Sequence, residues 1–140
     1  MKRKFIAQGQ DTSCFVVAVA NCLIHLGLPV PDMKKAIEVA GCQYGGSIHT
    51  QDVVEFMEAP LHPTRSRWDY KQVFKHGGIL TIMHPIVNGH ALFVAPDPND
   101  RRLVIAVNSW LGPNEYTLSP KTLEKYVTPR CHIGCHWVIK

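Results

Sequence analysis

Cys14 stands where a polar, glycine-containing stretch gives way to an unbroken run of small and apolar residues. Ser13, just before it, is a residue type that caps helix N-termini, so the sequence predicts that Cys14 lies in the first turn of a helix. Unpaired N–H groups and the positive end of the helix dipole favour a thiolate over a thiol at such a position. Cys14 is therefore a candidate nucleophile.

A cysteine nucleophile needs a base within hydrogen-bond reach and a third group that orients the base. Of the eight histidines, His90 follows a glycine and opens an expected strand, and Asn108 stands at the far end of the next one. A hairpin brings the start of one strand beside the end of the next, so these two residues can be neighbours. The asparagine oxygen could then accept the imidazole N–H and fix its tautomer, while the other ring nitrogen faces Cys14.

A reaction at a carbonyl also needs donors for the oxyanion that forms. Gln8 lies six residues before Cys14, and its side-chain amide could fold back to join the Cys14 backbone N–H in this task. One such donor is typically worth about 3 kcal/mol of barrier. Gln10 also precedes the helix and is the alternative.

Three segments together resemble the papain-like cysteine peptidases. Residues 8–15 hold Gln, Gly and then Ser-Cys-aromatic, residues 88–94 are similar to the family's histidine strand, and residues 107–112 contain Asn-Ser-Trp followed by glycine. Their order and spacing are close to those of the family. The short length and the order of elements are most similar to the bacterial and phage peptidase C39-like proteins.

The resemblance implies a catalytic triad of Cys14, His90 and Asn108, with Gln8 as the oxyanion donor because it holds the family's offset from the cysteine. It also implies a thiolate–imidazolium resting state. Cys14 would attack a carbonyl, His90 would protonate the leaving amine, and His90 would then act as base for the water that hydrolyses the thioester. No metal or other cofactor is expected.

The resemblance also assigns residues to the cleft. Trp110 is expected to cover the hydrogen bond between the triad's asparagine and histidine, and we assign Trp110, Gly46 and Gly89 to substrate binding. Two departures stand out. Phe15 replaces the usual tryptophan of papain, and many C39-like proteins have Asp where this chain has Asn108.

We therefore expect a thiol-dependent hydrolase, a cysteine peptidase that cleaves a peptide or isopeptide bond. The same constellation would serve a glutamine deamidase, a transglutaminase-like enzyme or a peptidoglycan amidase, and a non-catalytic peptide-binding domain is a further alternative. C39-like domains that remove leader peptides after a double glycine are usually part of an ABC transporter, and we do not assign that narrower role.

The elements that position these residues follow an α+β pattern, with helices first and antiparallel strands after. Capping residues, glycines and prolines predict helices over residues 13–26, 33–40, 51–58, 69–75 and 120–126, and strands over residues 79–83, 90–95, 103–107 and 136–139. We expect one papain-like domain over residues 1–140. In it, an N-terminal helical subdomain with a central nucleophile helix packs on a C-terminal antiparallel sheet.

Composition restricts partners and compartment. A net charge of +4 with a single basic cluster at residues 2–4 does not indicate a nucleic-acid-binding surface. No apolar run is long enough for a membrane span. The polar run 8–13 separates those charges from the apolar stretch, which argues against a signal peptide. Five cysteines favour a reducing compartment, so we expect a cytoplasmic protein. The expected partners are a peptide or protein substrate and a partner chain or inhibitor that limits activity.

Residues 131–136 contain two cysteines and two histidines, which invites a zinc interpretation. The spacing matches no standard zinc ribbon or finger. Alternate residues of a closing strand would also point to opposite faces. We therefore expect this segment to lead into a structural strand.

Overall fold

The computed structural model describes residues 14–40, 50–82, 90–108, 114–127 and 136–140, without the side chains of Arg67, Asn108 and Asn114. The helices are α1 (Cys14–Leu26), α2 (Met33–Ala40), α3 (Thr50–Phe56), the 3-10 turn η1 (Arg67–Asp69), α4 (Tyr70–His76) and α5 (Pro120–Glu124). The strands are β1 (Leu61–Pro63), β2 (Gly78–Ile82), β3 (His90–Pro96), β4 (Val104–Asn108), β5 (Asn114–Leu118) and β6 (Trp137–Ile139).

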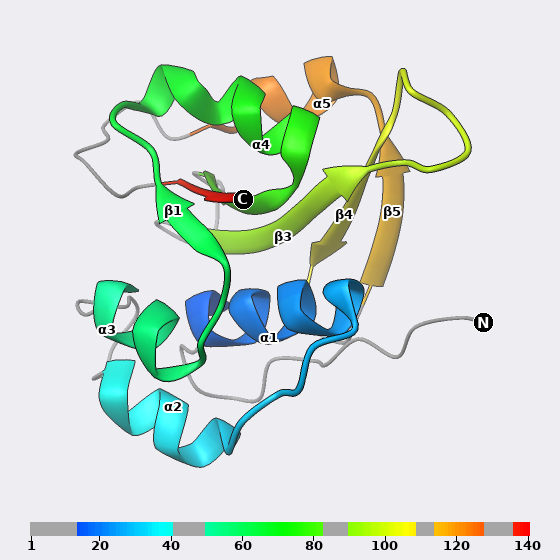
Figure 1. Ribbon diagram of the computed structural model, residues 1–140. Coiled ribbons are helices and arrows are strands. Elements are labelled where there is room, and N and C mark those ends of the chain that lie inside the picture. The colour runs from blue at the N-terminus through cyan, green and yellow to red at the C-terminus, as the bar shows by residue number, and fades with distance from the viewer. Residues whose placement is uncertain (1–13, 41–49, 83–89, 109–113, 128–135) are drawn as a thin grey trace.

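The strands form one antiparallel sheet in the order β1-β6-β2-β3-β4-β5. Helices α1, α2 and α3 lie on one side of this sheet, and α4 and α5 lie on the other (Figure 1). Each face therefore has its own apolar core, one built around α1 and one under α4 and α5. The architecture confirms the expected α+β class, with a central helix packed on an antiparallel sheet.

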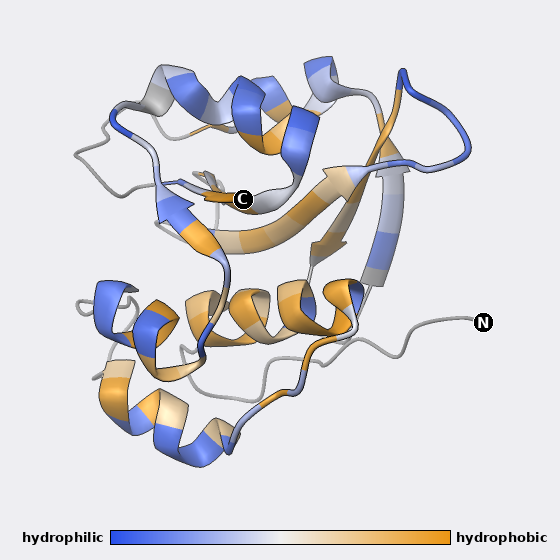
Figure 2. Cartoon of the chain, viewed as in Figure 1, coloured by the Kyte–Doolittle hydropathy of each residue, from blue (hydrophilic) through white to orange (hydrophobic). Residues whose placement is uncertain are grey.

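Helix α1 is the central helix of the fold. Residues 15–23 are all buried, and the helix is apolar around most of its circumference (Figure 2). It ends at Gly27, whose φ of 72° is the left-handed conformation that glycine adopts without cost. The Leu28 N–H donates to the Leu23 carbonyl at 2.9 Å, which completes the expected C-terminal cap.

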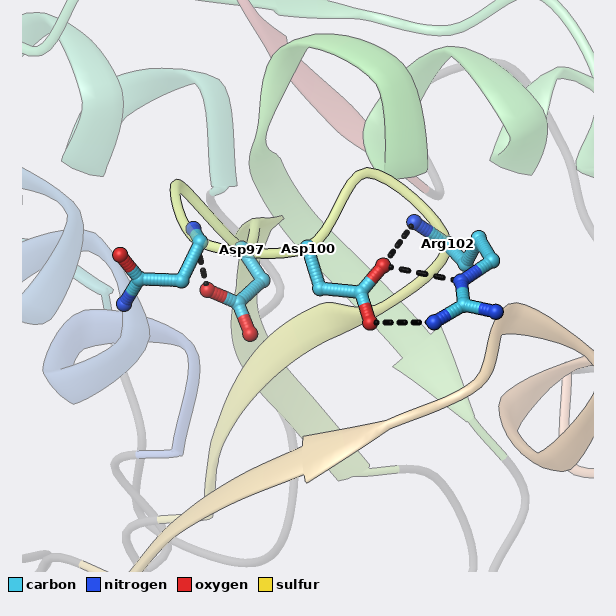
Figure 3. Close-up of polar contacts among 4 residues, drawn as sticks. Asp97, Asp100 and Arg102 are labelled. Carbon is cyan, nitrogen blue, oxygen red and sulfur yellow. Dashed lines mark hydrogen bonds and ion pairs between the residues drawn. The ribbon is translucent and has the colours of Figure 1, made fainter.

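The loop of residues 97–103 connects β3 and β4, the two strands that carry His90 and Asn108, and hydrogen bonds within it order its backbone. The Asp97 carboxylate accepts the Asn99 N–H at 2.9 Å, and the Asp100 carboxylate accepts the Arg102 N–H at 2.9 Å (Figure 3). The Arg102 guanidinium binds the same carboxylate in a fork, at 3.1 Å to each oxygen. This pairing lowers the pKa of Asp100.

Most expected boundaries agree with the structure to within one or two residues. The sequence predicts Asp32, Thr50 and Asp69 as helix caps, because each is a capping residue type at the start of an expected helix. Asp32 caps α2, because its carboxylate accepts the Lys34 N–H at 3.0 Å. The other two predictions are wrong in detail. Thr50 is the first residue of α3 rather than its cap, and Asp69 makes no cap bond to α4 but accepts the Ser66 N–H at 3.3 Å.

Strand β5 was not expected from the sequence. It is an edge strand, and the residues from Glu115 to Thr117 are exposed, so it lacks the apolar alternation that marks a strand with one buried face. It extends the sheet beyond β4 and pairs Asn108 with Asn114.

Among the helices that the structure describes, none combines the length and apolarity needed to cross a membrane.

Gly78 is where a side chain would be least tolerated in this sheet. Its φ is 152°, and a Cβ there would collide with the Trp137 carbonyl of β6. We expect Gly78→Ala to lower the free energy of unfolding by at least about 3 kcal/mol in urea denaturation. Gly27→Ala is the matched control, because that position is also left-handed but opens into free space, and it should cost only about 1–2 kcal/mol. Equal losses would contradict the close approach of β2 and β6.

Candidate active site

The Cys14 thiol lies at the first residue of α1 and is partly exposed. Three backbone N–H groups donate toward its sulfur: those of Cys14 and Phe15, which belong to the open first turn of the helix, and that of Ala91 in β3. The first two are the unpaired donors that every helix start presents. The third comes from the sheet, so the sulfur sits at the contact between the helix start and the beginning of β3.

Burial has the larger effect on this thiol. It raises the pKa of Cys14 above its ordinary value, while the donors from Ala91, Phe15 and Cys14 itself lower it by less. The helix start therefore supplies the anion-stabilising groups that the sequence predicts. The net change is nevertheless a raised pKa of Cys14, whereas the expected thiolate requires a lowered one. A thiolate at this position requires positive charge from a neighbouring group.

His90 is the first residue of β3 and is only 5% exposed. It pairs with Ile82 of β2 and directly precedes Ala91, whose N–H points to the Cys14 sulfur. The N–H groups of a strand lie close to the plane of the sheet. The sulfur therefore approaches that plane at the end of β3 where His90 stands.

Alternation along β3 decides how these two side chains can meet. Ala91 and Phe93 belong to the core on the α1 side, whereas Leu92 belongs to the core on the α4 side. His90 alternates with Ala91 and so shares the face of Leu92. A contact between Cys14 and His90 must therefore be made around the end of the strand, beside the sheet plane, and not across the interface between α1 and the sheet.

Asn108 is the last residue of β4. The β3–β4 register pairs Phe93 with Val107, and its continuation sets Asn108 opposite Leu92. His90 and Asn108 therefore occupy diagonal positions on adjacent strands, and such positions lie about 7–8 Å apart in sheets. The sequence predicts that the two residues can be neighbours, and the register places them one diagonal step apart.

Gln8, Gly46, Gly89 and Trp110 lie outside the described residues. Their assignment to the oxyanion hole and the cleft stays a prediction, as does the use of the Asn108 side chain as the third triad member.

The other cysteine that the structure describes behaves differently. Cys22 is fully buried in the middle of α1, and burial raises its pKa to about 12. His25, near the end of the same helix, packs its ring against Phe93 in a tilted arrangement, with ring centres 5.1 Å apart. These side chains belong to the interface between α1 and β3 rather than to the site.

The segment of residues 131–136, which we expect to lead into a structural strand, does so in its described part. Residues 137–139 form β6 as expected, and the fully buried His136 accepts the Thr81 N–H on Nδ1 at 3.1 Å. Across residues 14–40, 50–82, 90–108, 114–127 and 136–140, no three His, Cys, Asp or Glu side chains are grouped to hold a metal ion. Cys131, His132 and Cys135 lie outside these ranges.

Sequence reasoning missed the Ala91 N–H, which is the sheet's contribution to the sulfur. A backbone donor carries no side-chain signature, and alanine at this position looks like any core residue. The only available signal was its place directly after the candidate histidine.

Comparison with known proteins identifies the fold. No protein-family model matches the sequence, and no curated protein is similar to it in sequence. A solved structure does match: the peptidase domain of Streptococcus ComA, described as a bifunctional ABC transporter involved in a quorum-sensing pathway. The TM-score is 0.68 with 12% sequence identity, and the match covers 99% of this chain and 100% of that one.

The chain has a papain-like peptidase fold. In this fold α1 packs along β3, and the first residues of the two elements come together where the Ala91 N–H donates toward the Cys14 sulfur. At 12% identity the likeness establishes the fold alone.

The two described cysteines should differ sharply in reactivity. In the native protein at pH 7.5, we expect iodoacetamide to modify Cys14 at least about 100-fold faster than Cys22, because Cys14 is partly exposed and Cys22 is buried with a pKa near 12. Mass spectrometry of tryptic peptides measures both rates in one sample. In 6 M guanidinium chloride the difference should vanish, and comparable native rates would contradict the burial of Cys22.

Proposed function

We propose that this protein is a thiol-dependent hydrolase that cleaves peptide or isopeptide bonds with Cys14 as nucleophile and His90 as acid and base. The observation that carries the proposal is the position of the Cys14 sulfur. It is held by N–H donors at a helix start and by the N–H of the residue that follows His90, within a papain-like fold.

The raised pKa of Cys14 makes the histidine indispensable in this proposal. Burial holds the sulfur as a thiol when it is alone, so the thiolate forms by passing its proton to His90. The resulting imidazolium supplies the positive charge, and the three N–H groups supply hydrogen bonds to the sulfur. Burial then becomes an advantage, because an ion pair is stronger where water is scarce.

The proposed reaction proceeds in two stages. The thiolate attacks the substrate carbonyl, forming a C–S bond and an oxyanion that accepts hydrogen bonds from the Cys14 N–H and the Gln8 side chain. The oxyanion collapses, the C–N bond breaks, and the imidazolium of His90 gives its proton to the leaving amine. His90 then removes a proton from water, which attacks the thioester and restores the thiol and the free acid.

Asn108 is proposed as the positioning residue for the imidazole. From the end of β4 its side-chain oxygen would accept the ring N–H, leaving the other ring nitrogen to face the sulfur. The diagonal register of His90 and Asn108 supports this role. We propose the substrate only as a peptide or isopeptide bond. The role of the Streptococcus protein in an ABC transporter is a property of that protein and is not carried over to this chain.

A peptide library would test the reaction class. We expect the wild-type protein to generate new peptide termini from a proteome-derived library, read by mass spectrometry, and Cys14→Ala to generate none. His90→Ala should lower the rate by about 10²–10⁴-fold. Lys75→Ala is the control, because that lysine is exposed on α4 and should leave the rate unchanged. Conversion of glutamine to glutamate without new termini would instead identify a deamidase.

The pH dependence of Cys14 alkylation tests the ion pair itself. In the wild type, we expect rapid modification by iodoacetamide to persist below pH 7, because the imidazolium of His90 stabilises the thiolate. In His90→Ala, burial alone governs the thiol, so reactivity should appear only above pH 8.5, the ordinary cysteine value. Two superimposable pH profiles would exclude the pair and favour a peptide-binding domain.

Asn108→Ala tests orientation of the imidazole. We expect kcat to fall by about 10-fold or more with little change in KM, and Asn108→Asp to restore most of it, since a carboxylate also accepts the ring N–H. Asn99→Ala, an exposed asparagine at the β3–β4 turn, is the control and should behave as wild type. Equal rates for Asn108→Ala and the wild type would remove Asn108 from the mechanism.

A further inference from the structure

A groove of about 580 Å³ opens between α4 and the β1–β6 edge of the sheet. Helix α4 contributes Gln72 and His76, four residues apart and so on one helical face. The chain that runs through and past β1 contributes His62, Thr64 and Arg65. The volume lies within the range of sites that hold small molecules.

This groove is separate from the candidate active site. His62 pairs with Val138 of β6, and Val138 packs against the core on the α4 side of the sheet. Cys14 packs against the core on the α1 side. Of the described residues proposed for the reaction, neither Cys14 nor His90 lines the groove.

The charged side chains around the groove are mainly positive. Among the described residues that line it, Arg65 and Lys140 carry cationic side chains, and Asp69 carries the single acidic side chain. That carboxylate already accepts the Ser66 N–H at 3.3 Å. An excess of hydrogen-bond donors and positive charge is suited to an anion.

Thr64 adds a buried donor to this wall. The residue is only 5% exposed, and its hydroxyl oxygen accepts the His136 N–H at 3.3 Å. The hydroxyl proton is then left to donate, and within the described part of the chain no acceptor receives it. A buried donor without an acceptor is unfavourable, and a ligand oxygen in the groove would accept this proton.

We propose that this groove binds a small anionic molecule through the oxygens of a phosphate or carboxylate group, held by Arg65 and the Thr64 hydroxyl. A guanidinium offers a planar fork of N–H donors that matches either group in a bidentate manner. The Thr64 hydroxyl provides a third donor to the same oxygens. His62, His76 and Gln72 surround the remainder of the ligand with further polar groups.

The experiment is a titration of the ¹⁵N-labelled chain with inorganic phosphate, and separately with citrate, at constant ionic strength so that screening does not change. We expect saturable shifts of amide signals in residues 62–66 and 72–76. Arg65→Gln should weaken binding at least fivefold. Arg101→Gln removes the same charge at the exposed β3–β4 turn and should leave the affinity unchanged.

The two probes distinguish the sources of the anion, because the tighter one identifies whether phosphate or carboxylate is preferred. Thr64→Ser retains the hydroxyl and should bind as wild type, while Thr64→Val should bind more weakly. Shifts that never saturate, or equal losses in Arg65→Gln and Arg101→Gln, would show non-specific attraction and overturn the proposal. Because the readout is binding, its result is independent of Cys14 activity.

Discussion

The packing of α1 against β3 is the constraint on which the rest of the structure depends. The helix is buried along residues 15–23, and the strand meets it with Phe93 between two alanines, Ala91 and Ala95. Small side chains let the backbones approach closely, and this brings the Ala91 N–H to the Cys14 sulfur. The flanking strands hold β3 in place, and α2 and α3 shield the helix on its other side (Figure 1).

The same packing sets two opposing effects on the sulfur. Desolvation disfavours the anion, and the helix start together with the strand N–H favours it. Desolvation has the larger effect, so this cysteine alone is a weak nucleophile at neutral pH. In the proposed site this balance makes the reactivity of Cys14 depend on folding. The reactive thiolate would form only in a chain whose fold brings His90 to the end of β3.

Local signals in the sequence were enough to predict much of this arrangement. The apolar run after Cys14, the glycine after Leu26 and the turn at residues 96–100 each specify an element from neighbouring residues alone, and the structure contains all three. From them follow both ends of α1, the end of β3 and the beginning of β4, and thus the hairpin whose outer ends carry His90 and Asn108. The two segments on which the site depends were therefore readable from local chemistry.

What could not be predicted depends on neighbours that are distant in the chain or on the backbone. Strand β5 pairs at an exposed edge and needs no apolar pattern, and Asp69 turns to Ser66 instead of α4 because the 3-10 turn lies between them. The groove arises because β6 brings residues 138–140 beside residues 62–65. The desolvation of Cys14 is a property of the packed interior and has no counterpart in a local motif.

The position of β6 between β1 and β2 has a consequence for how the chain folds. Strand β1 has no direct partner in the described sheet other than β6, which comes last in the sequence, so the two hairpins in the middle can form early while this end of the sheet waits. Pairing between strands so far apart in the sequence is slow, because the entropic cost of closing the intervening loop comes before any stabilising contact forms. During synthesis, the strand edges that β6 later covers stay open until the C-terminal residues emerge, and this interval is when the nascent chain is most exposed to aggregation.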